Sequence, residues 1–426
     1  MKISIVGTGY VGLCSAVGFG LKGHDVVCID IDTDKVDKIN AGIAPIFEEG
    51  LEDGLKKLVS SGKLRATSHM RDILDTEVTF ISVGTPCDDE GRIDLRYINK
   101  AAEEIGNALR EKPVHFVVVK STVVPGTTES VGKIIENHSE KRLGDGLHIA
   151  MNPEFLREGQ ALKDFLNPDR IVIGVNDAKM SAKLEEVYEN FQAPKLVTTI
   201  KTAEMIKYAS NAFLATKISF MNEIGNMCKS LGINVNEVAR GMSYDERISP
   251  HFLESGVGFG GSCFPKDVMA LLRKAEETGH EPEMLKSVIS VNRKQPYKIV
   301  DILKNRIGSL GGKRIAVLGL AFKDGTDDVR ESPAIKVINR LLQEGAHVVA
   351  YDPVAMKNMQ SVINDIEYAS SIHSCLADAD ACLLLTKWNE FRQLNDFDFN
   401  GMKTRVIIEG RNILDSKVSG HEGICW

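Results

Sequence analysis

The first thirty residues alternate between short apolar runs and glycine-rich or polar stretches. Lys2–Val6 is a β-branched run typical of a strand, Gly7–Gly12 is rich in glycine, and Leu13–Lys22 has the composition of a helix. Asp25–Ile29 then predicts a second strand, which ends at Asp30. The order strand, helix, strand indicates a βαβ unit with parallel strands.

Further apolar runs extend this pattern into a sheet. Val78–Val83, Phe116–Lys120 and Arg170–Gly174 each predict a buried strand, because they are short and rich in β-branched residues. Helical stretches separate these runs, so we expect the strands to be parallel.

The opening pattern returns near residue 313. KRIAVLG predicts a strand, Pro333–Gln343 a helix and HVVAYD another strand, and the later runs ACLLLT and RVIIEG predict two more. This faint internal repeat indicates a second doubly wound domain. Segments 296–312 and 353–372 are expected to be linkers or variable stretches.

Between the two repeats the apolar spacing changes to the three- and four-residue steps of a helix. Residues 202–231 contain no proline and no glycine except Gly225, which predicts one helix of roughly thirty residues, about 45 Å long. A helix of this length is expected to join the flanking domains and to offer surface to a second subunit. We therefore predict an α/β protein with Rossmann-like domains at 1–198 and 296–426 and a central helical domain at 199–295.

Composition narrows the class of protein. The 426 residues carry a net charge of −7, from 52 basic and 59 acidic side chains, which argues against a general nucleic-acid or anionic-membrane binder. No apolar run approaches the ~18 residues of a membrane span, and no secretory signal opens the chain. The eight cysteines form no CxxC pair and have no zinc-ligand spacing, so we expect reduced thiols in the cytoplasm and no metal.

The turn GTGYVG fits the dinucleotide-binding pattern G-x-G-x-x-G between a strand and a helix. Gly7 permits the tight turn, Gly9 lets a pyrophosphate approach the backbone, and Gly12 lets helix and strand pack closely. Asp30 lies 23 residues after Gly7, where a carboxylate binds the adenosine ribose and repels a 2′-phosphate, so we predict NAD rather than NADP. Lys35 is a nearby cation that would tolerate phosphate, and a purely structural glycine turn is the alternative.

Four stretches carry polar residues without an evident structural role. They are KSTVVPGT (120–127), NPEFLREG (152–159), AEMIKYASNAF (203–213) and VGFGGSCFPKD (257–267). The glycines of the last stretch predict a flexible, displayed Cys263, whose thiolate Lys266 and any nearby helix N-terminus would favour.

Taken singly, these stretches have simpler interpretations. Glu154 and Glu158 fit a solvated acidic pair, and Lys207 and Asn211, which share a helix face, fit an exposed lysine and a capping-type asparagine. What changes this interpretation is that the stretches occur together in one chain.

Seven motifs in this order resemble the UDP-glucose 6-dehydrogenase family, within the nucleotide-sugar dehydrogenases that include GDP-mannose 6-dehydrogenase. They are GTGYVG, VGTP (83–86), STVVPGT, NPEFLREG, the Lys207/Asn211 helix, GFGGSCFPKD and FKDGTDDVRESP (322–333), and the resemblance spans residues 1 to about 412. It implies a four-electron oxidation of UDP-glucose to UDP-glucuronate with two NAD per turnover. GDP-mannose is the alternative substrate, and UDP-N-acetylmannosamine fits less well.

The resemblance also implies a mechanism. A base, through Lys207 or a water bound to Asp267, takes the hydroxyl proton during the first hydride transfer. Cys263 then forms a thiohemiacetal, and the second hydride transfer leaves a thioester that water hydrolyses. Lys207 and Asn211 would hold the oxyanion.

Residue roles follow by the same resemblance. The residues expected in catalysis are Thr122, Glu154, Glu158, Lys207, Asn211, Cys263 and Asp267. Those expected to bind NAD are Gly7, Gly9, Tyr10, Val11, Gly12, Asp30, Lys35, Thr85, Thr122, Glu158, Lys266 and Arg330. Those expected to bind the nucleotide sugar are Glu154, Phe155, Leu156, Lys207, Asn211, Arg247, Phe252, Phe259, Gly260, Lys323 and Arg411. Lys323 and Arg411 would bind the diphosphate, and Arg247 would cross from a partner subunit; a surface role is the alternative for Lys323.

Two positions depart from the family pattern, and two other classes of protein remain as rivals. Cys87 is assigned no chemistry, and Glu254 stands where some relatives carry lysine. Cys14 and Cys28 are expected in the core. A non-catalytic NAD or nucleotide-sugar sensor and a two-electron alcohol dehydrogenase are the rival classes, and a homodimer through the 202–231 helix is the expected assembly.

Overall fold

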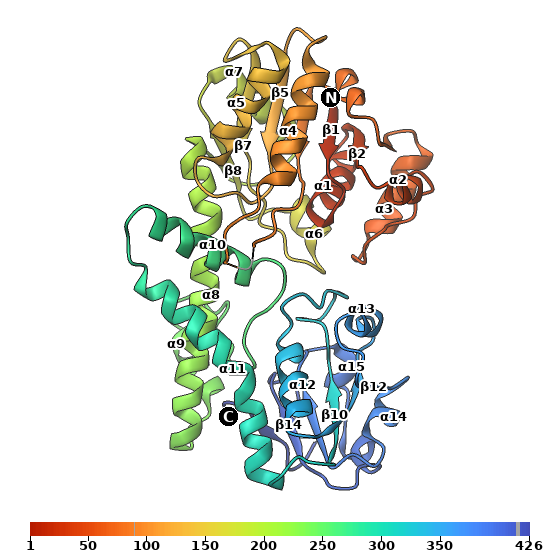
Figure 1. Ribbon diagram of the computed structural model, residues 1–426, viewed down its shortest axis with the longest axis vertical. Coiled ribbons are helices and arrows are strands. Elements are labelled where there is room, and N and C mark those ends of the chain that lie inside the picture. Colours follow the sequence, from red (N-terminus) through yellow and green to blue (C-terminus); the bar gives the residue numbers. More distant parts are fainter. Residues whose placement is uncertain (89, 415–417) are drawn as a thin grey trace. The chain divides into compact units, whose positions relative to one another are not determined.

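The computed structural model describes residues 1–88, 90–414 and 418–426. The chain divides into two compact units, Met1–Ser210 and Asn211–Trp426, each with its own parallel-type sheet (Figure 1).

Unit 1 contains a nine-stranded sheet with helices on both faces (Figure 1). The order is β3-β2-β1-β4-β5-β7-β8-β9, with β6 beside β7. The strands are β1 (Lys2–Val6), β2 (Asp25–Ile29), β3 (Leu64–Thr67), β4 (Val78–Ile81), β5 (His115–Val119), β6 (Arg142–Leu143), β7 (Gly146–Met151), β8 (Ile171–Val175) and β9 (Lys195–Thr198). The helices are α1 (Tyr10–Leu21), α2 (Thr33–Asn40), α3 (Leu51–Ser60), η1 (Met70–Asp75), α4 (Arg96–Leu109), α5 (Thr127–Ser139), α6 (Ala161–Leu166) and α7 (Ala178–Val187).

The expectation of parallel strands is correct for β1 to β5 and wrong for β8, which is antiparallel to β7. A parallel connection has to carry the chain back along the whole sheet. The only helix between β7 and β8 is α6, which has six residues and spans about 9 Å. The chain therefore turns at the carboxyl end of β7 and returns in the opposite direction.

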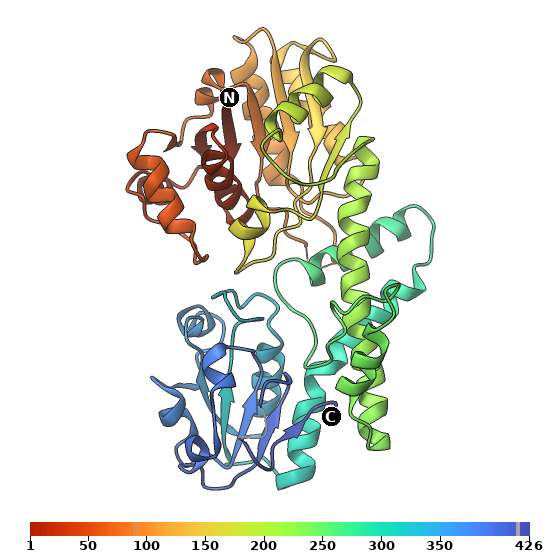
Figure 2. The same ribbon diagram turned by 180° about the vertical axis from the view of Figure 1, so that it is seen from behind.

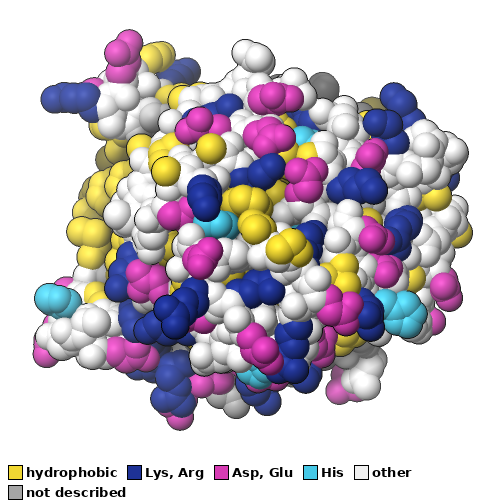
Figure 3. Space-filling view, turned by 90° about the horizontal axis from the view of Figure 1, so that it is seen from above, with side chains coloured by type: hydrophobic (Ala, Val, Ile, Leu, Met, Phe, Trp, Pro, Cys, Tyr) yellow, Lys and Arg dark blue, Asp and Glu magenta, His cyan; other side chains and the backbone are white. Residues whose placement is uncertain are grey.

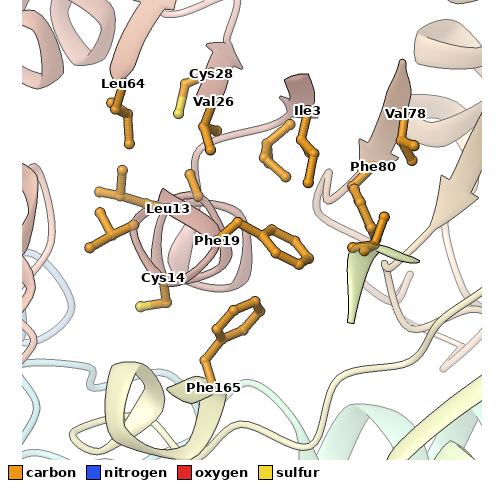
Figure 4. Packing of buried hydrophobic residues seen from close by; sticks show 14 of the residues in the cluster. Ile3, Leu13, Cys14, Phe19, Val26, Cys28, Leu64, Val78, Phe80 and Phe165 are labelled. Carbon is orange, nitrogen blue, oxygen red and sulfur yellow. The ribbon is translucent and has the colours of Figure 1, made fainter. Parts of the chain in front are cut away.

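Helix α1 forms the centre of the main core of unit 1. Figure 4 shows Leu13 and Phe19 of α1 facing Ile3, Val26 and Phe80 of the sheet, with Phe165 of α6 closing the cluster from the other side. The prediction that Cys14 and Cys28 are core residues is confirmed, since both are fully buried. Gly18 and Gly20 of α1 suit this close packing, because a Cβ on Gly18 would lie 2.1 Å from the Phe165 ring and a Cβ on Gly20 would lie 2.6 Å from the Leu58 side chain.

The predicted long helix is confirmed. Helix α8 (Ile200–Leu231) begins in unit 1 and continues in unit 2, where α9 (Val235–Ser243), α10 (Phe264–Glu277) and α11 (Glu283–Ile307) follow. Helices α8 and α11 cross at an angle (Figure 2) and are joined by a 3.1 Å hydrogen bond from Ser219 Oγ to the Val288 carbonyl. The expectation of a linker at 296–312 is wrong, because residues up to Ile307 continue α11, with Pro296 buried inside the helix.

The sheet of unit 2 has six strands, all parallel, in the order β12-β11-β10-β13-β14-β15. They are β10 (Arg314–Leu318), β11 (His347–Tyr351), β12 (Glu367–Tyr368), β13 (Ala381–Leu384), β14 (Ile407–Glu409) and β15 (Glu422–Gly423). Their helices are α12 (Pro333–Gln343), α13 (Met356–Gln360), α14 (Ile372–Leu376), α15 (Asn389–Arg392) and η2 (Asp396–Phe399). The second doubly wound domain is thus confirmed. Segment 353–372 is not a linker, because it contains α13 and the edge strand β12.

Charged side chains of both signs are mixed over the face of the molecule seen in Figure 3, with hydrophobic side chains scattered among them. Within the described part of the chain, no helix combines the length and apolar character that crossing a membrane requires.

Candidate functional site

The glycine-rich turn after β1 leaves an open place at the start of α1. Gly7 has a φ of +91°, and a Cβ on Gly12 would lie 1.8 Å from the Gly7 carbonyl oxygen, so both positions require glycine. A Cβ on Gly9 would meet nothing within 4 Å, and no side chain caps the first turn of α1, which contains Tyr10 and Val11. Backbone N–H groups and the helix dipole at such a terminus favour a phosphate.

Asp30 lies at the end of β2, beside this turn. Its Oδ2 accepts hydrogen bonds from Thr8 N at 2.7 Å and Thr8 Oγ1 at 2.6 Å, while Oδ1 accepts from Asp32 N at 3.0 Å. Burial alone would raise the pKa of Asp30, but the hydrogen bonds from Thr8 and Asp32 outweigh burial and lower the pKa. Lys35 lies 3.8 Å from Asp32 Oδ2. An ionised Asp30 with capacity left on Oδ1 fits the ribose hydroxyls of NAD.

Tyr10 connects the first helix with the 152–159 stretch. Its hydroxyl donates to Glu48 Oε2 at 2.7 Å, and the same carboxylate oxygen accepts from Gly159 N at 2.8 Å. Burial, together with Glu48, raises the pKa of Tyr10. Sequence reasoning missed Glu48, because nothing in the residues around position 48 marks a contact with Gly159.

Two loops that follow neighbouring strands are also tied together. Thr85 Oγ1, after β4, donates to the carbonyl of Thr122, after β5, at 2.9 Å. Thr122 and Glu158 are both half-buried. The carboxyl ends of β1, β2, β4 and β5 therefore carry most of the unit 1 residues that are expected to bind the cofactor, as in other open α/β sheets.

A buried ion pair lies in the same unit. Lys207 Nζ is 2.9 Å from Glu154 Oε1, and the two side chains are 4% and 6% exposed. Glu154 Oε2 also accepts from Leu156 N at 2.6 Å. Burial would raise the pKa of Glu154, but Lys207 and the Leu156 N–H outweigh it and lower the pKa. The alternatives of a solvated Glu154 and an exposed Lys207 are wrong.

The ring of Phe155 contacts two cations. Its ring centroid is 3.8 Å from the Arg170 guanidinium carbon and 5.5 Å from Lys207 Nζ, distances typical of cation–π contacts. The residues Glu154, Phe155 and Leu156 also line a pocket of about 180 Å³ in unit 1, together with Arg157 and Arg170.

Lys120, whose place in this unit sequence reasoning missed, also lines this pocket. Lys120, at the end of β5, is 3% exposed and donates to Asn152 Oδ1 at 3.0 Å, an oxygen that also accepts from Tyr188 OH at 2.5 Å. Burial lowers the pKa of Lys120 to about 8, with a further lowering by Lys207 and an opposing effect of Glu154. The one indication of its burial in the sequence is that Lys120 directly follows the β-branched run 117–119, because a lysine at that place is either buried or ends the strand.

In unit 2, a carboxylate one turn after the cysteine is bound by two donors. Asp267, 1% exposed, accepts from Asn211 Nδ2 at 2.6 Å on Oδ2 and from Lys266 Nζ at 2.6 Å on Oδ1. Asn211 is therefore no capping residue. Part of the Lys266 charge that was expected to favour the thiolate is used by Asp267.

Cys263 is half-buried and stands at the N-cap position of α10. A thiolate there benefits from the positive end of the helix dipole. Its Sγ is 3.7 Å from Ser262 Oγ. Lys266 and a helix N-terminus were both expected to favour the thiolate. The structure places Cys263 at a helix N-terminus, whereas Lys266 is paired with Asp267.

The glycines before Cys263 do not make a flexible, displayed loop. Residues 256–261 are all buried. A Cβ on Gly260 would lie 2.2 Å from the Glu331 carbonyl oxygen, and a Cβ on Gly261 would lie 2.6 Å from the Phe322 ring. Neither position therefore has room for a side chain, because other parts of unit 2 occupy that space.

The remaining residues expected to bind substrate or cofactor are spread over unit 2. Arg411 is half-buried and donates from Nη2 to the Gly258 carbonyl at 2.9 Å. Lys323 is half-buried, 5.7 Å from the Phe322 ring centroid. Arg247 and Arg330 are 89% and 62% exposed and contact Asp245 and Asp328.

Two further contacts concern the loop before the cysteine. The rings of Phe252 and Phe259 pack edge to face against Phe264, at 6.2 and 5.9 Å between centroids. Glu254, the position that departs from the family pattern, forms an ion pair with Lys387. Within the described residues, no group of three His, Cys, Asp or Glu side chains could hold a metal ion.

The second sheet also places an acid after its second strand, but this acid is saturated. Asp352 follows β11 and is fully buried. Its Oδ2 accepts from Leu320 N at 2.8 Å, Ala321 N at 3.1 Å and Trp388 Nε1 at 3.0 Å. Its Oδ1 accepts from Val354 N at 3.1 Å and Ala355 N at 2.9 Å. Asp352 therefore has no lone pair left for a ribose hydroxyl, in contrast to Asp30.

Three family models match the chain in order. The NAD binding domain of the UDP-glucose/GDP-mannose dehydrogenase family matches residues 1–192, the central domain of that family matches residues 201–294, and its UDP binding domain matches residues 316–416.

Individual relatives agree with these matches. The chain is 49% identical to the UDP-glucose 6-dehydrogenase AglM of Haloferax volcanii over 97% of both chains, and 45% identical to the UDP-glucose 6-dehydrogenase YwqF of Bacillus subtilis over 97% of this chain and 93% of the other. Among solved structures, a UDP-glucose dehydrogenase from the hyperthermophilic archaeon Pyrobaculum islandicum superposes with a TM-score of 0.95 at 42% identity, covering 100% of this chain and 98% of the other.

Proposed function

Because the chain belongs to the UDP-glucose/GDP-mannose dehydrogenase family and is an NAD-dependent nucleotide-sugar dehydrogenase, we propose that its substrate is UDP-glucose and its product UDP-glucuronate. The observation that carries the chemistry is the half-buried Cys263 at the N-terminus of α10, one turn before the buried Asp267–Asn211 pair. The choice of UDP-glucose is supported by the names of the relatives that are 49% and 45% identical.

The overall reaction oxidises the C6 alcohol by four electrons. One UDP-glucose, two NAD and one water give one UDP-glucuronate, two NADH and three protons. Bound NAD supplies the hydride acceptor, and the Gly7–Gly12 turn and Asp30 hold and orient it. The open side of Gly9 and the ionised Asp30 support this assignment. Tyr10, Val11, Lys35, Thr85, Lys266 and Arg330 are proposed to complete the binding of NAD.

In the first half of the reaction, the C6 hydroxyl loses its proton and C6 loses a hydride. A base, acting through Lys207 or through a water held by Asp267, takes this proton. The buried contact of Lys207 with Glu154 supports a role for Lys207, because the carboxylate fixes the position of Nζ. Lys207 and Asn211, one turn apart on α8, are proposed to stabilise the oxyanion, a contribution of roughly 3–4 kcal/mol per donor.

In the second half, the Cys263 thiolate adds to the C6 aldehyde and forms a thiohemiacetal. Loss of the second hydride from C6 leaves a thioester, and a water positioned by Thr122, Glu158 and Asp267 adds to its carbonyl carbon and releases the Cys263 thiolate. The covalent bond to sulfur holds the sugar while NADH is exchanged for NAD.

The nucleotide part of the substrate is proposed to bind at the sheet of unit 2. Lys323 and Arg411 would bind the diphosphate, and Phe252, Phe259 and Gly260 would lie beside the ligand, with Arg247 contributed by a partner subunit. The match of the UDP binding domain to residues 316–416 supports this assignment, and Phe155 and Leu156 are proposed for the sugar. On the same basis we propose the division into an NAD-binding domain (1–198), a central domain (199–295) and a UDP-sugar-binding domain (296–426).

A homodimer through α8 is proposed as the assembly. Phe213, Phe220 and Met227 are 64%, 48% and 56% exposed and recur at seven-residue steps, so they share one face of the helix. A large apolar face of this kind marks an association surface. We also propose a reducing compartment, the cytoplasm, since all eight cysteines are free thiols.

The proposal is tested with a panel of nucleotide sugars and a count of NADH. UDP-glucose should be oxidised with the highest kcat/KM and should yield two NADH per sugar. A higher kcat/KM for GDP-mannose would assign the alternative substrate, one NADH per sugar would indicate a two-electron alcohol dehydrogenase, and binding without turnover would indicate a sensor. Cys263→Ser should bind both ligands and stop after the first oxidation; normal formation of UDP-glucuronate by this variant would exclude Cys263 as the nucleophile.

A further inference from the structure

Carboxamide side chains from two helices hold the backbone that leads to Cys263. Asn292 of α11 takes both polar backbone groups of Phe259: its Oδ1 accepts from Phe259 N at 2.8 Å, and its Nδ2 donates to the Phe259 carbonyl at 3.0 Å. Buried backbone groups need such partners, and no helix or strand provides them at this position. Asn292 therefore replaces a strand neighbour for one residue of the loop.

Three residues earlier, a second pair of amides repeats the arrangement. Gly256 N donates to Asn222 Oδ1 at 2.7 Å, and the Gly256 carbonyl accepts from Gln295 Nε2 at 2.8 Å. Asn226 Nδ2 in turn donates to Gln295 Oε1 at 2.9 Å. Gly256 is thus anchored to both α8 and α11 without any contribution from Asn292.

Gly258 explains how Asn292 can approach the backbone so closely. This glycine has a φ of +98°, and a Cβ on it would lie 2.7 Å from Asn292 Oδ1. Any other residue would be strained by the backbone conformation and would push the carboxamide away from Phe259. The missing side chain at Gly258 is therefore what allows Asn292 to reach Phe259, although 34 positions separate the glycine from the asparagine in the sequence.

The segment between Phe259 and Cys263 is held in place by further backbone contacts. Gly261 N donates to the Arg330 carbonyl at 3.0 Å, and Gly260 is in contact with the Glu331 backbone. Asp267 N donates to the Cys263 carbonyl at 2.8 Å, which starts α10. A shift of Phe259 is therefore transmitted to the N-terminus of α10, where the thiol lies.

We propose that Asn292 is a positioning residue for Cys263: by holding both backbone groups of Phe259, it fixes the point at which the chain enters α10 and hence the place of the Cys263 sulfur. This inference rests on the proposed role of Cys263 as nucleophile. It assigns to Asn292 no contact with substrate or cofactor.

The test compares Asn292→Ala with Ser219→Ala. Ser219 is a matched control, because it is buried and also joins α8 to α11, through the 3.1 Å bond to Val288, but does not contact the loop. Asn292→Ala should lower kcat roughly 10- to 100-fold with the KM values for NAD and UDP-glucose nearly unchanged, since misplacement of a reacting atom by about 1 Å costs this much. Ser219→Ala should keep the kcat of the unmodified protein.

A second readout needs no substrate. The rate of alkylation of Cys263 by iodoacetamide, followed by mass spectrometry of the peptide that contains it, reports the thiolate at the N-terminus of α10. In Asn292→Ala the alkylation should be several-fold slower at pH 7 and equal to that of the unmodified protein at pH 10, where the thiolate forms without help from the helix. Unchanged kcat together with an unchanged alkylation profile would overturn the proposal.

A variant that fails to fold is replaced by Asn292→Asp, which keeps the size of the side chain and the bond to Phe259 N but not the donor to its carbonyl. It should change kcat and alkylation in the same direction, and wild-type values would overturn the proposal. Failure of the proposed function is recognised separately, because the unmodified protein would then not give two NADH per UDP-glucose, whereas failure of the positioning role leaves that count at two.

Discussion

Lys207 and Glu154 form an ion pair 2.9 Å long in which neither side chain is more than 6% exposed, although 53 positions separate them in the sequence. A charge buried to this degree is stable only together with its partner. Loss of either residue therefore affects the fold as well as the reaction, and activity measurements on single variants have to be read beside their stability.

Glu154→Gln should lower the free energy of unfolding by about 3 kcal/mol, because it leaves the Lys207 ammonium buried without its carboxylate. Lys207→Met should cost a similar amount, and the double variant should recover most of the loss, since both charges are then gone. Urea unfolding of the four proteins at pH 7.5 gives the double-mutant cycle. Simple additivity of the two single losses would contradict the coupling.

Asp30→Asn should reduce the preference for NAD over NADP. The amide oxygen can still accept from Thr8, so the turn stays in place, but the negative charge that binds the ribose and repels a 2′-phosphate is lost. The kcat/KM for NAD should fall about tenfold, the value of one hydrogen bond to a charged group, while that for NADP rises. Steady-state kinetics with both cofactors provide the ratio, and an unchanged ratio would exclude Asp30 as its determinant.

Lys120→Met should stabilise the protein at neutral pH. Burial lowers the pKa of Lys120 to about 8 from an ordinary value of 10.5, so between these values the unfolded chain binds more protons and stability rises with pH. The stabilising contribution of the neutral amine is complete above pH 10.5 and is lost as the pH falls through 8, a difference of about 3 kcal/mol. The variant should thus exceed the unmodified protein by about this amount at pH 7, with a smaller gap at pH 10 in urea titrations. A gap independent of pH would show that Lys120 is ionised equally in both states.

Phe220→Asp should convert the proposed dimer to a monomer, because it places a charge in the centre of the Phe213–Phe220–Met227 face of α8. Multi-angle light scattering at micromolar concentration measures the mass directly. Phe397→Asp is the control, since Phe397 is 82% exposed on η2, away from α8, and its replacement should leave the mass unchanged. A monomeric mass for the unmodified protein would exclude the dimer.

Local signals were sufficient for much of the fold. The β-branched run at 25–29 and the apolar helix at 333–343 have the bounds that the sequence predicts, because short-range preferences and burial agree there. The segment 296–312 is helical up to Ile307 although a proline inside a helix normally breaks it, and α11 packs there against α10 and α12. The direction of β8 depends on the short connection through α6, and the residues of the strand itself do not indicate whether it runs parallel or antiparallel to β7.

The candidate site shows the same limit more clearly. Gly7, Gly12 and Asp30 could be assigned from spacing because one βαβ unit contains them all. The contacts of Lys207 with Glu154 and of Gly258 with Asn292 join segments that are far apart in the chain. The residues around each of these positions do not indicate which distant residue it will contact. The glycines before Cys263 predicted a displayed loop for the same reason: the residues that bury them, Asn292, Phe322 and Glu331, are distant in the sequence.

The saturation of Asp352 has a consequence for the protein as a whole. A chain with two sheets of similar topology could bind the same dinucleotide at both, and the second dinucleotide would then compete with the nucleotide sugar that we propose binds there. Because the hydrogen bonds of Asp352 are all made within its own domain, the second sheet offers no free carboxylate to a ribose. We therefore infer that the dinucleotide binds at the first sheet alone and leaves the second to the nucleotide sugar.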